Sequence, residues 1–207
     1  MQLNNEISML RFGIMKKLLG IVVLGLLLIN PSQADDIRDF QIEGMSIGDS
    51  ALDFFTEKEI NLKKKEGFIY KNKKFFSSTF RYKSFYKVYD GVQFHLKAED
   101  KKYLIYSISG QIYYKNNINE CYSKLDEIVS EIKTMFENST IDDVGKTAHN
   151  VDKKSTVQTV YIDLESGDYI TVECYDWFKD ENKPDSLTIS IDTKEFANWL
   201  SNFSDKE

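Results

Sequence analysis

The residue types that most often carry chemistry, cysteine and histidine, are scarce in this 207-residue chain. There are two cysteines, Cys121 and Cys174, and two histidines, His95 and His149. Neither histidine has a second histidine or a cysteine three or four residues away, which is the spacing of a local metal motif. No serine stands in a G-x-S-x-G nucleophile elbow. The sequence therefore predicts no catalytic residue, no metal site and no cofactor.

Carboxylates are abundant, and any distant pair of them could act as an acid and a base. A hydrolase whose carboxylates are not adjacent in sequence therefore stays open as an alternative. Acidic residues also flank the second cysteine, but they lack the spacing of a calcium loop, and a solvated acidic hairpin explains them better. These residues are Asp163, Glu165, Asp168, Glu173 and Asp176.

Basic side chains gather in one segment, where they alternate with aromatic residues. Between Lys58 and Lys87 ten basic residues stand against two acidic ones, a local balance of +8 in a chain whose net charge is −6. This asymmetry is typical of a binding surface. The candidate surface residues are Lys63, Lys64, Lys65, Lys71, Lys73, Lys74, Arg81 and Lys83.

The partner of such a surface follows from charge and compartment. Basic and aromatic residues together can hold single-stranded nucleic acid, but the acidic balance of the whole chain argues against that partner. We expect an anionic component of the cell envelope, such as lipid head groups or acidic glycans, or an acidic protein patch. The alternative is a hairpin with its aromatic residues packed inward and its lysines solvated.

An export signal opens the chain. A basic start at Met15 precedes the apolar run Leu18–Ile29, and small residues follow up to Ala34. This pattern predicts a signal peptide over 1–34, with its natural start at Met15 and cleavage after Ala34. A membrane anchor is the alternative, but a span needs about 20 apolar residues and this run has 12. We expect a periplasmic or secreted domain over 35–207 with no transmembrane segment.

Export would place both cysteines in an oxidising compartment. Cys121 falls on the apolar stripe of a predicted helix, and Cys174 shares a strand face with Ile170 and Val172. We therefore expect a Cys121–Cys174 disulfide between helix and sheet, which would close a loop of about 50 residues and contribute about 4 kcal/mol. Two buried free thiols are the alternative.

Three helices are expected to position these residues. A central helix is predicted over about 119–137, with Asn119 as its N-cap. A capping box at 192–195 predicts a C-terminal helix over about 193–203. A short N-terminal helix is expected over about 47–55, where capping explains the glycine-rich start better than phosphate binding does.

The remaining patterns predict strands. Asp90-Gly91 indicates a hairpin between 86–89 and 92–96, with His95 pointing outward. Tyr103–Ser109, Thr156–Leu164, Tyr169–Trp177 and a strand around Ile189 alternate as strands do, whereas 137–155 is expected to be a loop. Grouped strands joined by hairpin turns predict one α+β domain with an antiparallel sheet.

Three motifs carry a resemblance: IRDFQIEGMSIGDSALDFF near Asp35, NNINECYSKLDEIV in the central helix and SGDYITVECYDW around Cys174. Together they resemble a group of uncharacterised small exported proteins from AT-rich marine alphaproteobacteria, over nearly the whole mature chain. The resemblance brings no activity, so no functional residue is carried over. The helix start Gly44-Met45-Ser46 is also similar to that of small outer-membrane assembly lipoproteins, but their lipidated cysteine is missing here.

These observations favour a non-enzymatic exported protein that binds a partner at the cell envelope through its basic and aromatic segment. The hydrolase described above is one alternative. A purely structural or inhibitor-like module is another, and the sequence leaves both open.

Overall fold

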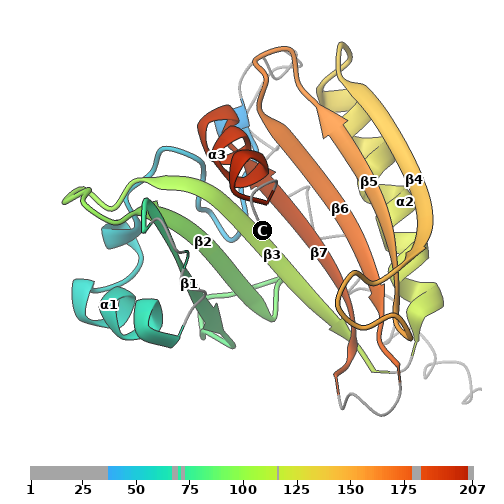
Figure 1. Cartoon of the computed structure of the whole chain (residues 1–207), viewed down its shortest axis with the longest axis horizontal. Coiled ribbons are helices and arrows are strands. Elements are labelled where there is room, and N and C mark those ends of the chain that lie inside the picture. The colour runs from blue at the N-terminus through green and yellow to red at the C-terminus, as the bar shows by residue number, and fades with distance from the viewer. Residues whose placement is uncertain (1–36, 67–69, 71–72, 116, 179–182, 205–207) are drawn as a thin grey trace, which may run out of the picture. The chain divides into compact units, whose positions relative to one another are not determined.

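A seven-stranded antiparallel sheet organises the protein in a computed structural model, which describes residues 37–66, 70, 73–115, 117–178 and 183–204 (Figure 1). The described residues lie in one compact unit, 33–207. The predicted leader at 1–34 and the candidate residue Lys71 lie outside them. The strands are β1 (Phe75–Arg81), β2 (Gly91–Lys97), β3 (Ile105–Tyr114), β4 (Thr140–Ala148), β5 (Thr156–Asp163), β6 (Tyr169–Asp176) and β7 (Asp185–Asp192).

The strand order β1-β2-β3-β7-β6-β5-β4 joins two sequential groups of strands. After β3, helix α2 (Ile118–Met135) carries the chain to β4 at the far edge, and β4 to β7 then return strand by strand until β7 pairs with β3. The predicted α+β class with an antiparallel sheet is confirmed. No helix among the described residues is long and apolar enough to cross a bilayer.

One face of the sheet carries the main hydrophobic core. Alternate residues such as Ile108, Val172 and Ile189 are fully buried there, because successive side chains of a strand point to opposite faces. Helix α2 covers β6 and β7 with the stripe of Cys121, Leu125, Ile128 and Ile132. Helix α1 (Glu57–Glu66) covers β1 with Ile60.

The segment before α1 completes this core but is not the helix expected over 47–55. It contains short 3-10 helices at Ile37–Asp39 and Ala51–Asp53. Gly48 has a φ of +88°, which an α-helix cannot include. Regular helix begins only at Glu57, where Thr56 and Glu59 form a capping box: the Glu59 amide donates to Thr56 Oγ1 at 3.3 Å, and the Thr56 amide to the Glu59 carboxylate at 3.0 Å.

The expected hairpin at Asp90-Gly91 is wrong, since residues 86–89 form no strand. The carboxylate of Glu43 instead accepts the amide hydrogens of Lys87, Val88 and Tyr89 at 2.7–2.8 Å, so these amides are unavailable for a sheet. β2 pairs with β1. The ring of Tyr89 packs against Gly110 of β3. A Cβ atom at position 110 would lie only 2.5 Å from ring atoms of Tyr89, which explains why a glycine stands within this strand.

The expected loop at 137–155 contains the edge strand β4. Its side chains are mostly exposed on both faces, so the sequence shows no alternation of apolar and polar residues. Gly145, with a φ of +70°, lies at a register shift in its pairing with β5. The other face of the sheet carries helix α3 (Lys194–Ser204), in front of the sheet in Figure 1, whereas α2 lies behind it.

Candidate functional site

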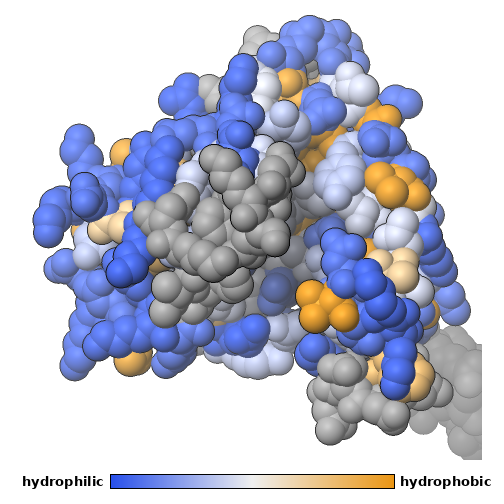
Figure 2. Space-filling model, in the orientation of Figure 1, coloured by the Kyte–Doolittle hydropathy of each residue, from blue (hydrophilic) through white to orange (hydrophobic). Residues whose placement is uncertain are grey.

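The basic segment forms α1, the approach to β1, β1 itself and the connection to β2. Lys63, Lys64 and Lys65 lie in the last turn of α1. Lys73 and Lys74 precede β1, Arg81 ends it, and Lys83 follows it. Figure 2 shows hydrophilic residues dominating the side of the molecule where α1 lies, while residues of intermediate hydropathy gather over β5 and β6.

Most aromatic residues of this segment belong to the interior. Phe75, Phe76 and Phe80 are buried, and the Phe80 ring stacks on Phe55 with centroids 3.9 Å apart. Tyr82 and Phe85 differ, since their exposed fractions are 71% and 43%. The aromatic residues therefore act mainly as core, as the hairpin alternative supposed, while the lysines remain on the surface.

Contacts bring the lysines of α1 and the residues after β1 to the same part of the molecule. Lys83 Nζ lies 2.9 Å from a Glu59 carboxylate oxygen on α1, and Phe85 packs against Phe55. The hydrogen bonds that Lys83 and Thr56 donate to the ionised carboxylate lower the pKa of Glu59 to about 2. Lys64 Nζ lies 4.2 Å from the ring centroid of Phe76 in β1.

Arg81 is directed away from α1. Arg81 alternates with Phe80 along β1, and its Nε donates to the Tyr113 hydroxyl at 3.0 Å. It therefore lies on the α3 side of the sheet, away from the lysines of α1. We name "basic surface" the half-buried and exposed side chains of α1 and of the segments just before and after β1, namely Leu62, Lys63, Lys64, Lys65, Lys73, Lys74, Tyr82, Lys83 and Phe85.

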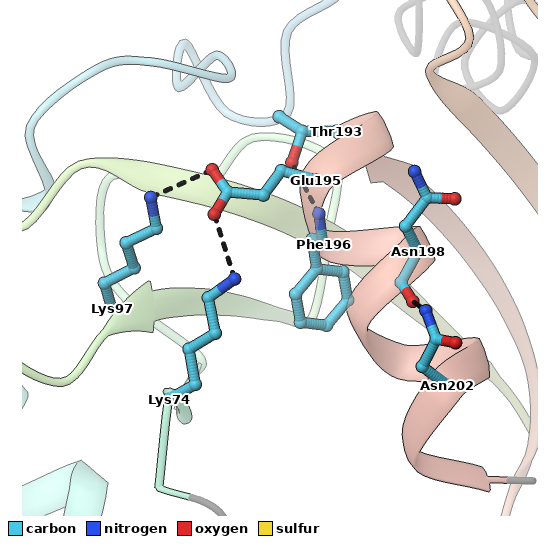
Figure 3. A network of polar contacts seen from close by, with 7 residues as sticks. All are labelled: Lys74, Lys97, Thr193, Glu195, Phe196, Asn198 and Asn202. Atoms are coloured by element: carbon cyan, nitrogen blue, oxygen red, sulfur yellow. Dashed lines mark hydrogen bonds and ion pairs between the residues drawn. The ribbon is translucent and has the colours of Figure 1, made fainter.

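At the other side of β1, two lysines converge on one carboxylate. Lys74 Nζ and Lys97 Nζ lie 3.1 Å and 2.9 Å from the two carboxylate oxygens of Glu195, in the first turn of α3 (Figure 3). The same turn is capped by Thr193 Oγ1, which accepts the Phe196 amide hydrogen at 3.2 Å. The roles of Lys97 and Glu195 were not predicted, because the two residues stand almost a hundred positions apart in the sequence.

His95, expected to point outward, is buried beneath α3. Its Nε2 lies 3.0 Å from the Tyr70 hydroxyl and its Nδ1 lies 3.1 Å from Ser107 Oγ. The expectation failed because α3 covers this face, with the Phe196 ring 4.5 Å from the imidazole. Burial lowers the pKa of His95 to about 4 and raises that of Asp192, which is hydrogen-bonded to Ser107, to about 6.

Two shielded carboxyl groups share this polar face of the sheet. Glu173 accepts hydrogen bonds from the Tyr175 and Thr159 hydroxyls at 2.8 and 3.3 Å, and burial raises its pKa. Glu173 is paired with Thr188 on β7, four residues from Asp192. Burial is the main cause of the raised pKa of Asp192, and the charge of Glu173 adds to it.

The predicted disulfide is present. Cys121 of α2 is bonded to Cys174 of β6, with Cα atoms 6.0 Å apart. Within the described part of the chain, no group of three or more His, Cys, Asp or Glu side chains could hold a metal ion.

Comparison of this chain with protein-family models, with curated proteins and with solved structures produced no match.

Proposed function

We propose that this protein is an exported, non-enzymatic binding domain that attaches to an anionic membrane surface of the cell envelope through its basic surface. The observation that carries the proposal is the mixture of side chains around α1. Leu62 and Phe85, with exposed fractions of 55% and 43%, stand among lysines. Lysines are attracted to anionic head groups, and exposed apolar side chains gain free energy when they enter the layer beneath.

The apolar residues favour an anionic bilayer over the other anionic partners considered. An acidic glycan attracts lysines equally well but offers no apolar layer to Leu62 and Phe85. Tyr82, 71% exposed, has the amphipathic ring that sits well at a membrane interface. A disulfide between helix and sheet supports the exported location, because such bonds persist in oxidising compartments.

Vesicle binding tests the proposed surface. The variant K63Q/K64Q/K65Q/K73Q/K74Q should bind vesicles containing phosphatidylglycerol more than about a hundredfold more weakly than the natural chain, since each lysine near an anionic surface contributes about 1 kcal/mol. A sedimentation assay across a salt series measures this.

A matched control changes five exposed lysines elsewhere. The variant K101Q/K102Q/K115Q/K133Q/K153Q makes the same change in net charge and should retain most of the binding. Equal losses in the two variants, or binding that neither salt nor either variant alters, would show that the basic surface is not the attachment site.

Intact mass tests the exported state independently. The chain expressed with its own leader in an exporting host should begin at Asp35 and weigh two hydrogens less than its reduced form. A full-length mass with two alkylatable thiols would contradict export and return cytosolic partners to consideration.

A further inference from the structure

The loop between β1 and β2 carries part of the basic surface but has no regular secondary structure over residues 82–90. The Tyr82 amide donates to the Asp90 carbonyl oxygen at 2.8 Å and closes the loop at its base. Lys83 and Phe85 stand between these ends, and Phe85 is one of the two apolar side chains on which the proposed attachment depends. Contacts outside a strand ladder must therefore hold Phe85 in place.

Glu43 holds the second half of this loop. Its Oε2 accepts the amide hydrogen of Lys87 at 2.8 Å, and its Oε1 accepts those of Val88 and Tyr89 at 2.7 and 2.8 Å. Successive backbone amides directed at one anion form a nest, an arrangement that binds negative charge. Because both carboxylate oxygens are used, a shorter side chain could not make all three bonds.

The turn that carries Glu43 is itself fixed in the core. Ile42 and Met45 exchange two backbone hydrogen bonds of 3.0 Å, and both are fully buried. Glu43 and Gly44, between them, have φ values of +53° and +79°, as a tight two-residue turn requires. A residue other than glycine is uncommon in this left-handed conformation, so the glutamate indicates a use for its side chain.

Phe55 makes a second contact between the N-terminal segment and the loop. Its ring centroid lies 5.8 Å from that of Phe85. Lys83 joins the loop to α1, with 2.9 Å between its Nζ and a carboxylate oxygen of Glu59. The loop is therefore held at three points, by Glu43, by Phe55 and by α1.

We propose that Glu43 is a positioning residue of the membrane-attachment site: by fixing residues 87–89 it orders the loop in advance, so that Phe85 is presented together with the lysines of α1. This inference rests on the proposed attachment to membranes. Side chains that must be immobilised on binding reduce affinity, and a loop that is already fixed avoids this loss. An anionic membrane repels the charge of Glu43, so the positioning role acts through its hydrogen bonds alone.

The test uses E43D, which keeps the charge but shortens the side chain by one methylene group. The loop should then be released, and binding to phosphatidylglycerol vesicles should weaken about fivefold, the typical effect of immobilising one side chain on binding. In an F85A background E43D should have no further effect, because the side chain that it positions is gone. The matched control is E66D, which shortens the carboxylate that Lys63 contacts and should leave binding unchanged in both backgrounds.

Hydrogen exchange of the amides of Lys87, Val88 and Tyr89 gives a readout that needs no membrane. These amides should be protected in the natural chain and in E66D, and they should exchange faster in E43D. Circular dichroism and thermal unfolding verify that each variant is folded at the assay temperature. Unchanged protection in E43D would overturn the inference, since the bonds of Glu43 would then not be what holds the loop.

Vesicle binding separates a positioning role from a merely structural one. If Glu43 only stabilised the fold, E43D would lower the unfolding temperature but bind as tightly as the natural chain. That outcome, or an equal loss from E43D with and without F85A, would overturn the inference while attachment through the basic surface still stood. Failure of the natural chain to bind the vesicles would overturn the proposed attachment itself, and the positioning role with it.

Discussion

The two faces of the sheet differ in the side chains that they present. The face under α2 presents isoleucine, valine and leucine side chains, and the Cys121–Cys174 bond links it to α2. The opposite face, on which α3 lies, presents hydroxyl groups along β3 and β7, such as Ser109 and Ser190, whose oxygens are 2.8 Å apart. Its apolar cluster is small and consists of Tyr70, Phe75, Phe196 and Trp199, with Tyr106 packed against it.

Because of this difference, the stability of the two faces should depend differently on pH and salt. Apolar burial and a disulfide involve no titrating group and no ion pair that salt would screen, so the α2 face should hold the fold over a wide range of pH. The α3 face contains buried His95 and half-buried Asp192, and an exposed ion pair at its border, so its stability should depend on pH and salt. Four changes test this division, and they are taken from the largest expected effect to the smallest.

Removal of the disulfide should have the largest effect. C121A/C174A should lower the free energy of unfolding by about 4 kcal/mol, because the bond closes a loop over a sequence separation of 53 residues. Urea unfolding of the natural and variant chains measures this, with the reduced natural chain as a second comparison. A loss below about 1 kcal/mol would mean that apolar packing alone holds the α2 face.

Acidification should act through His95. Its pKa is ordinarily 6.5 and is about 4 in the folded chain, so protonation of His95 favours the unfolded chain. The protein should therefore have its full stability above pH 6.5 and lose stability as the pH falls toward 4. The loss should reach about 3 kcal/mol at pH 4 and be absent in H95Q. Denaturant unfolding between pH 7 and 4 measures it, with H149Q as the control for the other histidine. Parallel pH profiles for H95Q and the natural chain would contradict the prediction.

Asp192 should have the opposite pH dependence. Its pKa rises from 3.8 to about 6 on folding, so its favourable contribution is present below pH 3.8 and is lost as the pH rises through 6. D192N should therefore stabilise the protein by about 3 kcal/mol at pH 8 and change little at pH 4. Thermal unfolding at both pH values measures this, and D163N, at an exposed carboxylate, serves as the control. Destabilisation by D192N at pH 8 would show that the ionised carboxylate is needed.

Glu195 should have the smallest effect on stability. E195Q breaks two exposed ion pairs and should lower the free energy of unfolding by less than about 1 kcal/mol, and less still at high salt. Urea unfolding at low and high salt measures this. A salt-independent loss of several kcal/mol would mean that Glu195 supports α3 by packing rather than by charge.

The sequence was most informative about the α2 face. The apolar stripe of the helix and the alternation around Cys174 both face one core, so local periodicity was enough to predict the disulfide. The α+β class followed from the grouping of strands. Each of these inferences depends on neighbours within a single element, which a sequence shows directly.

The contacts of the α3 face could not be predicted from the sequence because they join distant parts of the chain. Alternation correctly separates His95 from Phe94, but only the position of α3 decides that the outer side is covered. Strand β4 was not predicted because an exposed edge strand needs no apolar face and so shows no alternation of apolar and polar residues. The hairpin at Asp90-Gly91 was misread because the Glu43 carboxylate, more than forty residues earlier, binds the amides that a strand would have used.

The pairing of β3 with β7 also sets the order in which the protein can fold. A ribosome makes β3 long before β7, and α2 with β4, β5 and β6 must follow before the neighbouring strand exists. Until then β3 has an open edge, where backbone groups can pair with another chain. Such distant pairing slows folding. An incomplete chain that ends before Asp185 should therefore aggregate, and the complete chain should fold only after its last strand is released.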